Sequence, residues 1–184
     1  AQGRAFFGDV RNRCIWVRSA EGEVTRFSQP QDRLLGVFGL ALDEARGVLW
    51  AGVSAVPEMA GFTAADRGLA YLAEYDLRTG ALRRSLPMAT PGGEHVFGSL
   101  RIARDGSVFV SDSASPVIWR AAQGATHLEA WLEHGEFVSL QGLDFTADGR
   151  TLYVADYANG IWAIDVATKN PTLLRPAEDT SLFG

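Results

Sequence analysis

Ala147-Asp148-Gly149-Arg150, followed by the strand-like run Thr151–Ala155 and then Asp156, is the stretch that decides the fold. The chain contains this unit, a glycine turn followed by a short apolar strand, four times. The turn glycines are Gly3, Gly47, Gly106 and Gly149, spaced 44, 59 and 43 residues apart. A period of about 40–50 residues that contains only strand signals predicts the blades of a β-propeller.

Each unit is expected to contain four antiparallel strands, because short runs rich in Val, Ile, Leu and aromatic residues alternate with Gly/Asp turns. In the third unit these runs are Leu100–Ala103, Val108–Ser111, Val117–Arg120 and His127–Leu132. In the fourth unit they are Leu143–Phe145, Thr151–Val154, Ile161–Ile164 and Thr172–Leu174. The sequence therefore predicts an all-β propeller with about four blades, at residues 1–36, 37–97, 98–140 and 141–178, with 179–184 starting a further blade.

Tryptophans recur at one position of the repeat, in Ile15-Trp16, Ile118-Trp119 and Ile161-Trp162. Each pair opens a third strand, six or seven residues after an aspartate. Large apolar side chains at a repeated position are expected to pack between neighbouring blades.

Composition narrows the function classes. The chain has 184 residues, 47% of them hydrophobic, which is enough for a real core. A net charge of −5 argues against a nucleic-acid partner, which needs a clustered basic face. No run of about 18 apolar residues is present, so we expect no membrane span. The single Cys14 is expected to be a small core residue; the composition describes a soluble protein and leaves its compartment open.

The 59-residue interval holds an insertion, which falls in Val53–Gly68. Its composition, with Pro57, Met59, Gly61 and Phe62, is typical of a loop. A loop after a second strand shares a rim with the start of each first strand, around the central channel. We therefore expect Pro57, Met59 and Phe62 to form a lid; the alternative is a tolerated surface insertion.

Candidate site residues lie where first strands start and second strands end. At the channel mouth the sequence places Phe38, His95, Ser99, Asp112 and Asp156. Asp9, Asp112 and Asp156 take equivalent places after second strands, whereas the second unit has Gly52 there. A repeated carboxylate after a strand accepts backbone N–H groups and fixes the loop, so a structural role is the main interpretation. If the three converged, they could instead hold a hard cation.

His95 is the one histidine at the start of a first strand, and it is the candidate for a general base because imidazole titrates near neutrality. The alternative is a polar loop residue beside Gly92-Gly93-Glu94. No GxSxG, HExxH, P-loop, EF-hand or CxxC pattern occurs, so the sequence supports none of those mechanisms.

The segment 141–156 resembles the repeats of the regucalcin/gluconolactonase (senescence-marker-protein-type) family, and Ser107–Asp112 and Phe38–Gly52 are similar to the same repeats. The resemblance implies a six-bladed propeller of which this chain is a part. It also implies one divalent cation in the channel, typically Ca²⁺, which polarises a lactone carbonyl and activates water. The family's Asn-Gly-Leu ligand motif corresponds to Gln141-Gly142-Leu143, so the resemblance makes Gln141 the metal-ligand candidate.

The chain departs from the family pattern at other positions. The family's glutamate ligand would precede Ala1 and a later aspartate would follow Gly184, while polar contact positions read Phe38-Gly39 and Gly98-Ser99. Two functions follow: a divergent lactone or ester hydrolase that binds a cation and a small polar molecule in the channel, or a non-catalytic scaffold that binds a ligand or a protein. If the chain stands alone, its open blade edges are expected to drive self-association.

Overall fold

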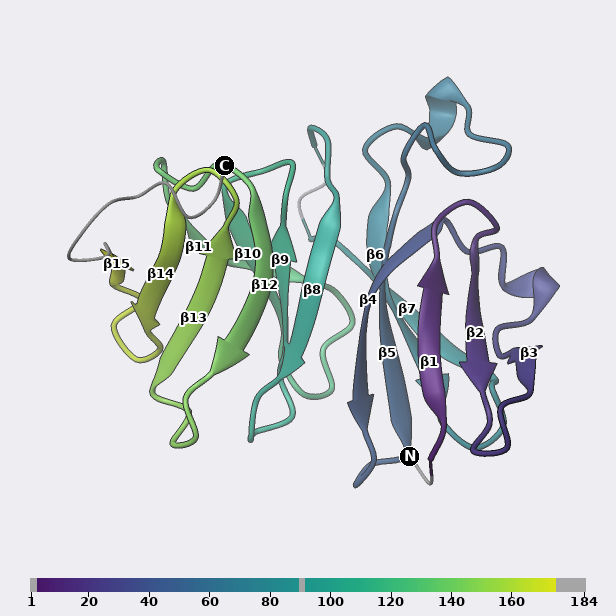
Figure 1. Cartoon of the computed structure of the whole chain (residues 1–184). Coiled ribbons are helices and arrows are strands. Elements are labelled where there is room, and N and C mark those ends of the chain that lie inside the picture. The colour runs from purple at the N-terminus through teal and green to yellow at the C-terminus, as the bar shows by residue number, and fades with distance from the viewer. Residues whose placement is uncertain (1–2, 90–91, 175–184) are drawn as a thin grey trace.

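The computed structural model describes residues 3–89 and 92–174, which form an arc of four antiparallel β-sheets (Figure 1). The first sheet contains β1 (Ala5–Asp9), β2 (Cys14–Arg18) and β3 (Val24–Arg26). The second contains β4 (Gly36–Asp43), β5 (Val48–Ser54), β6 (Ala70–Asp76) and β7 (Leu82–Pro87). The third contains β8 (Phe97–Ile102), β9 (Val108–Asp112), β10 (Val117–Ala121) and β11 (Glu129–Glu133). The fourth contains β12 (Leu140–Phe145), β13 (Thr151–Asp156), β14 (Gly160–Asp165) and β15 (Pro171–Leu174).

These sheets confirm the predicted fold class, an all-β propeller with four-stranded antiparallel blades, for three of the four sheets. The first strands β4, β8 and β12 start one residue before the predicted blade boundaries at 37, 98 and 141. The two helical segments in the described residues are single 3₁₀ turns, η1 (Pro30–Asp32) and η2 (Ala64–Asp66). No helix in the described residues is long and apolar enough to span a membrane. Residues 179–184, where a further blade was expected to begin, lie outside the described part.

The strand register fixes which residues are equivalent. Phe97 pairs with Asp112, Leu140 with Asp156 and Val37 with Val53. The repeated aspartate of the other sheets therefore corresponds to Val53 in the second sheet, not to Gly52 as the sequence suggested. The register shift in the first strand is the same in all three sheets. Val53 follows the turn glycine Gly47 by six residues, as Asp112 follows Gly106. β1 ends in Asp9 and so takes the place of a second strand in the three-stranded first sheet.

The turn glycines behave as the repeat predicts. Gly47, Gly106 and Gly149 have φ angles of +64°, +85° and +74°, a region that glycine adopts without steric cost. Each one closes the hairpin between a first and a second strand, which explains why the glycine recurs in every unit.

The buried apolar residues do not form a single central core but three clusters, each between two neighbouring sheets. One buried cluster joins the first and second sheets, another the second and third, and another the third and fourth. Trp119 belongs to the second of these clusters and Trp162 to the third, so the prediction that the repeated tryptophans pack between blades is confirmed for these two. Trp16 is half-buried and belongs to none of the three clusters. Cys14 is fully buried, as expected.

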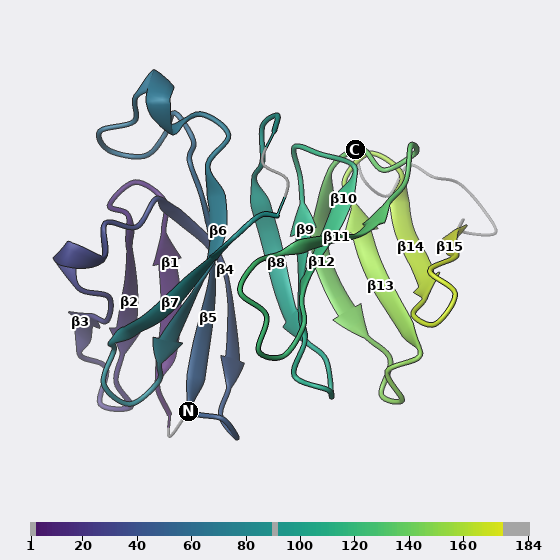
Figure 2. The ribbon, with the colours of Figure 1, turned by 180° about the vertical axis from the view of Figure 1, so that it is seen from behind.

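Seen from either side, the insertion between β5 and β6 projects beyond one end of the strands and carries η2 (Figures 1 and 2). β4 starts at this end, which we call the upper rim, and β8 and β12 start there as well. The first strands approach one another closely below it. A Cβ on Gly39 would lie 2.4 Å from the carbonyl oxygen of Gly98 in β8. The backbones therefore leave no room for a side chain at position 39, one of the two positions where a polar pair was expected.

Candidate functional site

Asp112 ends β9 at the upper rim and is fully buried. Its carboxylate accepts hydrogen bonds from Val96 N (3.0 Å), Ala114 N (3.1 Å), Ser115 Oγ (2.7 Å), Trp119 Nε1 (3.1 Å) and His95 Nδ1 (2.7 Å). A carboxylate offers about four lone-pair sites, so these donors occupy it completely. Asp112 is a structural centre that ties the loop after β9 to the start of β8.

Asp156 and Asp9 repeat this arrangement in the fourth and first sheets. Asp156 accepts from Val138 N (3.1 Å), Ser139 N (3.2 Å), Ala158 N (3.1 Å), Asn159 Nδ2 (3.1 Å) and Trp162 Nε1 (3.2 Å). Asp9 accepts from Asn12 N (2.8 Å), Asn12 Nδ2 (2.8 Å) and Trp16 Nε1 (3.0 Å). The tryptophan bond recurs in all three sheets, which explains the six- or seven-residue spacing between aspartate and tryptophan in the sequence.

These hydrogen bonds favour the ionised form of two of the carboxyl groups, Asp156 and Asp9. Burial alone would raise the pKa of Asp156, but the donors from Val138, Ser139 and Asn159 outweigh it and bring the pKa below its usual value. Burial also opposes ionisation of Asp9, whose pKa is nevertheless lowered by bonds from Asn12 and Trp16. Carboxylates that are ionised and fully engaged in this way are poor proton carriers, which supports their structural interpretation.

His95 lies beside Asp112 with both ring nitrogens engaged. Nδ1 lies 2.7 Å from Asp112 Oδ2 and Nε2 lies 2.6 Å from the carbonyl oxygen of Gly92. Both partners are acceptors, so the ring satisfies them only with a proton on each nitrogen. The ring also packs edge-on against Trp119, with centroids 5.5 Å apart. In this arrangement His95 has no lone pair to accept a proton, and its role as a base stays a prediction that requires the bond to Gly92 to open.

The insertion reaches the same place and encloses a small hollow of about 170 Å³. Its lining is mainly apolar, with the buried His95 at one side, and consists of Ala55, Val56, Pro57, Phe62, Arg67, Gly68, Glu94, His95 and Val96. Arg67 in the insertion and Glu94 in the facing loop form an exposed ion pair at 2.5 Å across it. The structure thus brings His95 together with two of the three predicted lid residues, Pro57 and Phe62.

Met59, the third predicted lid residue, points into the molecule. It is buried in the cluster between the first and second sheets, where Phe62 is partly buried as well. The backbone N–H of Ala60 donates to the carbonyl oxygen of Arg11, at 2.9 Å, so the insertion is also tied to the first sheet. Part of the insertion therefore extends the core, a role that its loop-like composition did not indicate.

The remaining predicted residues line the starts of the first strands. Gln141 is exposed, and its side-chain amide donates to Ser139 Oγ at 3.2 Å. Ser99 is half-buried and its backbone N–H donates to Ser111 Oγ at 2.9 Å, while Ser111 Oγ donates in turn to the carbonyl oxygen of Gln141. Phe38 is half-buried on β4. Their roles at the channel mouth stay predictions.

The residues present do not fit a Ca²⁺ centre around Gln141. In the described part of the chain, no group of three or more His, Cys, Asp or Glu is placed to hold a metal ion. The carboxylate on the same strand, Asp144, pairs with Arg101 at 3.1 Å. Asp112 and Asp156 are engaged by their own donors, so Gln141 lacks the carboxylate partners that calcium prefers.

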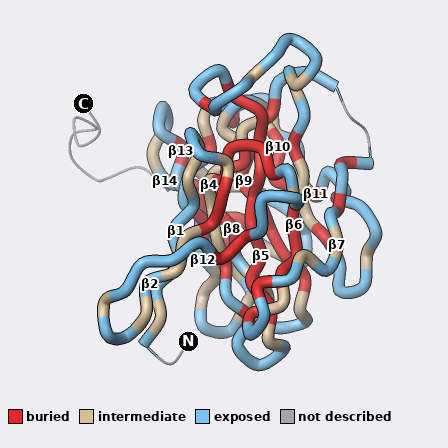
Figure 3. Tube along the Cα trace, turned by 90° about the vertical axis from the view of Figure 1, so that its right-hand side faces the viewer, coloured by how far each residue is buried: buried red, intermediate tan, exposed pale blue. Residues whose placement is uncertain are grey.

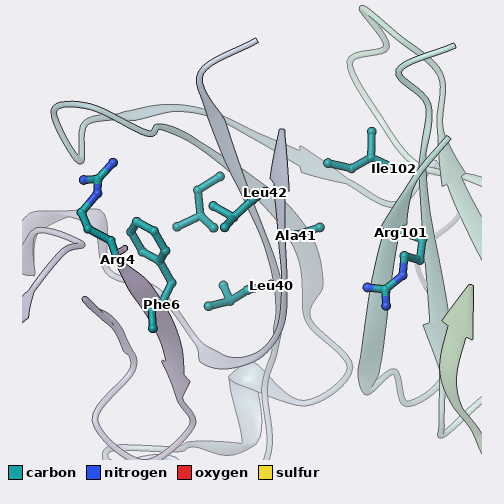
Figure 4. A pocket seen from close by; sticks show the side chains of 9 residues that line it. Arg4, Phe6, Leu40, Ala41, Leu42, Arg101 and Ile102 are labelled. Atoms are coloured by element: carbon teal, nitrogen blue, oxygen red, sulfur yellow. The ribbon is translucent and has the colours of Figure 1, made fainter. Parts of the chain in front are cut away.

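A larger hollow of about 330 Å³ lies at the opposite rim and is lined by residues of the first, second and third sheets (Figure 4). Arg4 and Arg101 stand on opposite sides of an apolar floor formed by Phe6, Leu40 and Leu42. Arg4, Ala5 and Phe6 belong to or adjoin β1, which lies at the edge of its sheet. A strand paired to β1, as β4 is paired to β5, would fill this hollow, so we do not assign it as a ligand site.

Sequence reasoning missed His134. It follows β11 and contacts Trp162 with ring centroids 5.5 Å apart, as His95 contacts Trp119. Its Nδ1 is buried and has no hydrogen-bond partner in the described part of the chain. The position of His134 in the repeat could have indicated it. His95 precedes the start of a first strand by two residues, and His134 precedes the next by six.

The comparisons with known proteins agree with the fold. No family model matches the sequence, and no curated protein matches it either. Among solved structures, a chain of a nidogen/laminin complex matches with a TM-score of 0.71 and 15% identity, over 92% of this chain and 58% of its own. A streptogramin B lyase matches with a TM-score of 0.70 and 14% identity, over 97% of this chain and 53% of its own.

A catalytically inactive virginiamycin B lyase from Staphylococcus aureus, solved with quinupristin, matches with a TM-score of 0.71 and 12% identity, over 98% of this chain and 55% of its own. These neighbours are six-bladed propellers, and this chain spans a little over half the length of each. At such identities the likeness shows the fold alone. The chain therefore has the architecture of part of a six-bladed propeller, while its resemblance to the regucalcin/gluconolactonase repeats is matched by no family model.

Proposed function

We propose that this chain belongs to a non-catalytic β-propeller whose upper rim binds a protein or peptide partner. The observation that carries the proposal is the state of the ionisable groups at that rim. Asp112, Asp156 and His95 each have their polar atoms engaged by fixed partners. Groups held in this way stabilise loops, and they would have to give up these bonds before they could exchange protons with a substrate.

The hollow beneath the insertion supports a binding role. Its apolar wall consists of Val56, Pro57, Phe62 and Val96, and its volume of about 170 Å³ suits one apolar side chain rather than a drug-sized molecule. The Arg67–Glu94 pair at its border offers a cation and an anion to the flanking groups of a peptide. An apolar anchor inside a polar border is the usual arrangement at the centre of a protein interface.

Peptide-display selection against the immobilised chain tests this function, with Phe62→Ser as the site variant. Burying one apolar side chain contributes roughly 1.5–3 kcal/mol, so we expect the variant to lose about tenfold or more in affinity for the selected peptides. Val138→Ser, which removes an exposed apolar side chain in the loop before β12, is the control and should bind unchanged. Failure to enrich any peptide with an apolar anchor would contradict the proposal, as would equal binding by Phe62→Ser.

A divergent cation-dependent lactone or ester hydrolase is the second candidate function, supported by the exposed amide of Gln141 at the start of β12. Calorimetric titration of calcium into the chain and into Gln141→Ala separates the two. Calcium binding that the substitution weakens would favour the hydrolase and justify a screen of lactones. Since the donor set around Gln141 lacks carboxylates, we expect no binding by either protein.

A further inference from the structure

A hollow of about 320 Å³ lies between the third and fourth sheets, where Gly106 and Gly149 close two neighbouring hairpins. We call this end of the molecule, which is opposite the upper rim, the lower rim. Figure 3 shows mainly buried strands in the middle of the molecule and mainly exposed turns at its ends. The hollow lies where two of these turns meet the buried interior, and its lining comes from the third and fourth sheets alone.

The inner wall of the hollow is aromatic. The ring of Phe109 in β9 meets those of Trp131 in β11 and Phe145 in β12 edge-on, with centroids 5.0 and 5.1 Å apart. Phe109 and Trp131 are buried, whereas Phe145 is half-buried. Val166, which follows β14, adds an aliphatic side chain to this wall. Three rings around one hollow form a surface against which a further flat ring can pack.

Two arginines line the same hollow, and within the described residues neither has a close carboxylate partner. The exposed Arg104 donates to the carbonyl oxygen of Ala147 in the facing turn and forms no ion pair with a described carboxylate. Arg120 lies 3.4 Å from Asp105 and 3.6 Å from Glu129. Both distances exceed the roughly 2.7–2.9 Å of a good charge-assisted hydrogen bond. The hollow therefore carries positive charge that its own residues neutralise poorly.

The hollow between the second and third sheets, at the same rim, is built differently. It measures about 210 Å³, and its arginines have close acidic partners. Arg46 bonds Asp43 at 2.7 Å, and Arg84 bonds Glu74 at 2.5 Å. The strand register places Ala103 in the third sheet where the second has Asp43, so the acid that neutralises an arginine there has no counterpart. The two hollows occupy equivalent places, and only the one between the third and fourth sheets is left open by its ion pairs.

The charges around the aromatic wall favour an anion over a cation. Arg120 Cζ lies 5.7 Å from the ring centroid of Phe109, and Lys169 Nζ lies 5.7 Å from that of Trp131. Cations therefore already face two of the three rings, and a cationic ligand would meet like charges there.

Two carboxylates also line the hollow, and each is held in its own turn. Asp105 accepts from Ser107 N at 2.9 Å and Ser107 Oγ at 3.0 Å. Asp148 accepts from Thr146 Oγ1 at 2.6 Å and from Arg150 N at 3.0 Å. Burial opposes the ionisation of Asp105, but its hydrogen bonds outweigh burial and lower its pKa. Both groups thus have partners within their turns, and the arginines are the groups that can receive an anionic ligand.

We propose that this hollow binds a small aromatic carboxylate, with its ring against Phe109, Trp131 and Phe145 and its carboxylate at Arg104. A volume of about 320 Å³ is at the small end of ligand sites and suits a molecule of one or two rings. The carbonyl group of Ala147 takes one of the five N–H donors of Arg104, and the others are enough for two bonds to a carboxylate. The inference does not depend on the proposed function of the upper rim.

Isothermal titration calorimetry with three probes of one ring system tests the proposal. The probes are naphthoate, its carboxamide and its aminomethyl counterpart, all substituted at the same ring position, so that they are anionic, neutral and cationic. We expect naphthoate to bind most tightly and the amine least tightly. Arg104→Gln should weaken the binding of naphthoate by about tenfold and leave that of the carboxamide within about twofold.

Arg150→Gln is the matched control, because the exposed Arg150 lies in the facing turn and does not line the hollow. It should bind all three probes like the unmodified chain. Val166→Trp fills the hollow and should abolish binding of naphthoate and of the carboxamide.

The proposal is overturned if naphthoate does not bind, if it binds no more tightly than the amine, or if Arg104→Gln binds it unchanged. Binding that survives in Val166→Trp would place the probe elsewhere and would overturn it as well. Thermal unfolding checks that each variant is folded. If Val166→Trp is not, the contrast between Arg104→Gln and Arg150→Gln, both at exposed positions, decides the question.

Discussion

The third and fourth sheets have nearly the same internal construction and very different surroundings. Both end their second strand in a buried aspartate that binds the indole N–H of a tryptophan, Trp119 or Trp162. Phe109 of the third sheet is buried against the fourth, whereas the equivalent Tyr153 has no following sheet in the described chain and is exposed. A blade therefore supplies a carboxylate-centred loop by itself, whereas it gains a buried face only from a neighbouring sheet.

The largest expected effect contrasts Phe109→Ala with Tyr153→Ala. Phe109 contacts the rings of Trp131 and Phe145 at 5.0 and 5.1 Å, so its loss leaves a cavity and should lower the free energy of unfolding by about 3–5 kcal/mol. Tyr153→Ala should change it by no more than about 0.5 kcal/mol in the monomer. Urea denaturation measures both, at a concentration where the chain is monomeric. Similar losses for the two variants would show that the following sheet does not stabilise the aromatic residue at this position.

Asp112→Ala tests what the blade supplies by itself. It removes the acceptor of the His95, Trp119 and Ser115 side chains in a buried site, and we expect a loss of about 3 kcal/mol or more in the free energy of unfolding. Asp156→Ala should also lower the free energy of unfolding, but by less. The side chains that donate to Asp156 are the amide of Asn159 and the indole of Trp162, and they include no histidine. A loss below about 1 kcal/mol for Asp112→Ala would contradict the structural role.

Gly39 and Gly142 hold equivalent positions in β4 and β12, and only Gly39 has a neighbouring first strand in its way. A Cβ at position 39 meets the carbonyl oxygen of Gly98, whereas one at position 142 meets nothing within 4 Å. Gly39→Ala should therefore destabilise the chain by about 1–3 kcal/mol. Gly142→Ala is the matched control and should be nearly neutral by thermal unfolding. Destabilisation by Gly142→Ala alone would show that the equivalence is wrong.

The smallest expected effect is on pH dependence. The pKa values of Asp9 and Asp156 are lowered in the folded chain, so their contribution to stability is complete above the unfolded-state value of about 3.9. It is lost as the pH falls through the lower folded values. Unfolding free energy should decline below about pH 4, and the decline should be shallower in Asp156→Asn. A variant with an unchanged slope would remove Asp156 from this account.

Much of the fold could be predicted because the signals are local. The turn glycines, the strands and the aspartate–tryptophan spacing all lie within one hairpin or two, so the repeat displays them directly. The contact of His95 with Asp112 joins residues 17 apart through the strand pairing, and no spacing rule indicates it. The inward position of Met59 likewise depends on a neighbouring sheet that covers it, and Val53 replaced Gly52 as the aspartate equivalent only when the register was known.

The most direct test of the central claim, that the ionisable groups of the upper rim are held in structural bonds, is NMR detection of the His95 ring. Long-range proton–nitrogen spectra of the chain and of His95→Gln identify its signals among the three histidines. We expect a proton on both ring nitrogens, each protected from exchange with water by Asp112 or Gly92. A ring with one unprotonated nitrogen in rapid exchange with solvent would contradict it and restore His95 as a catalytic base.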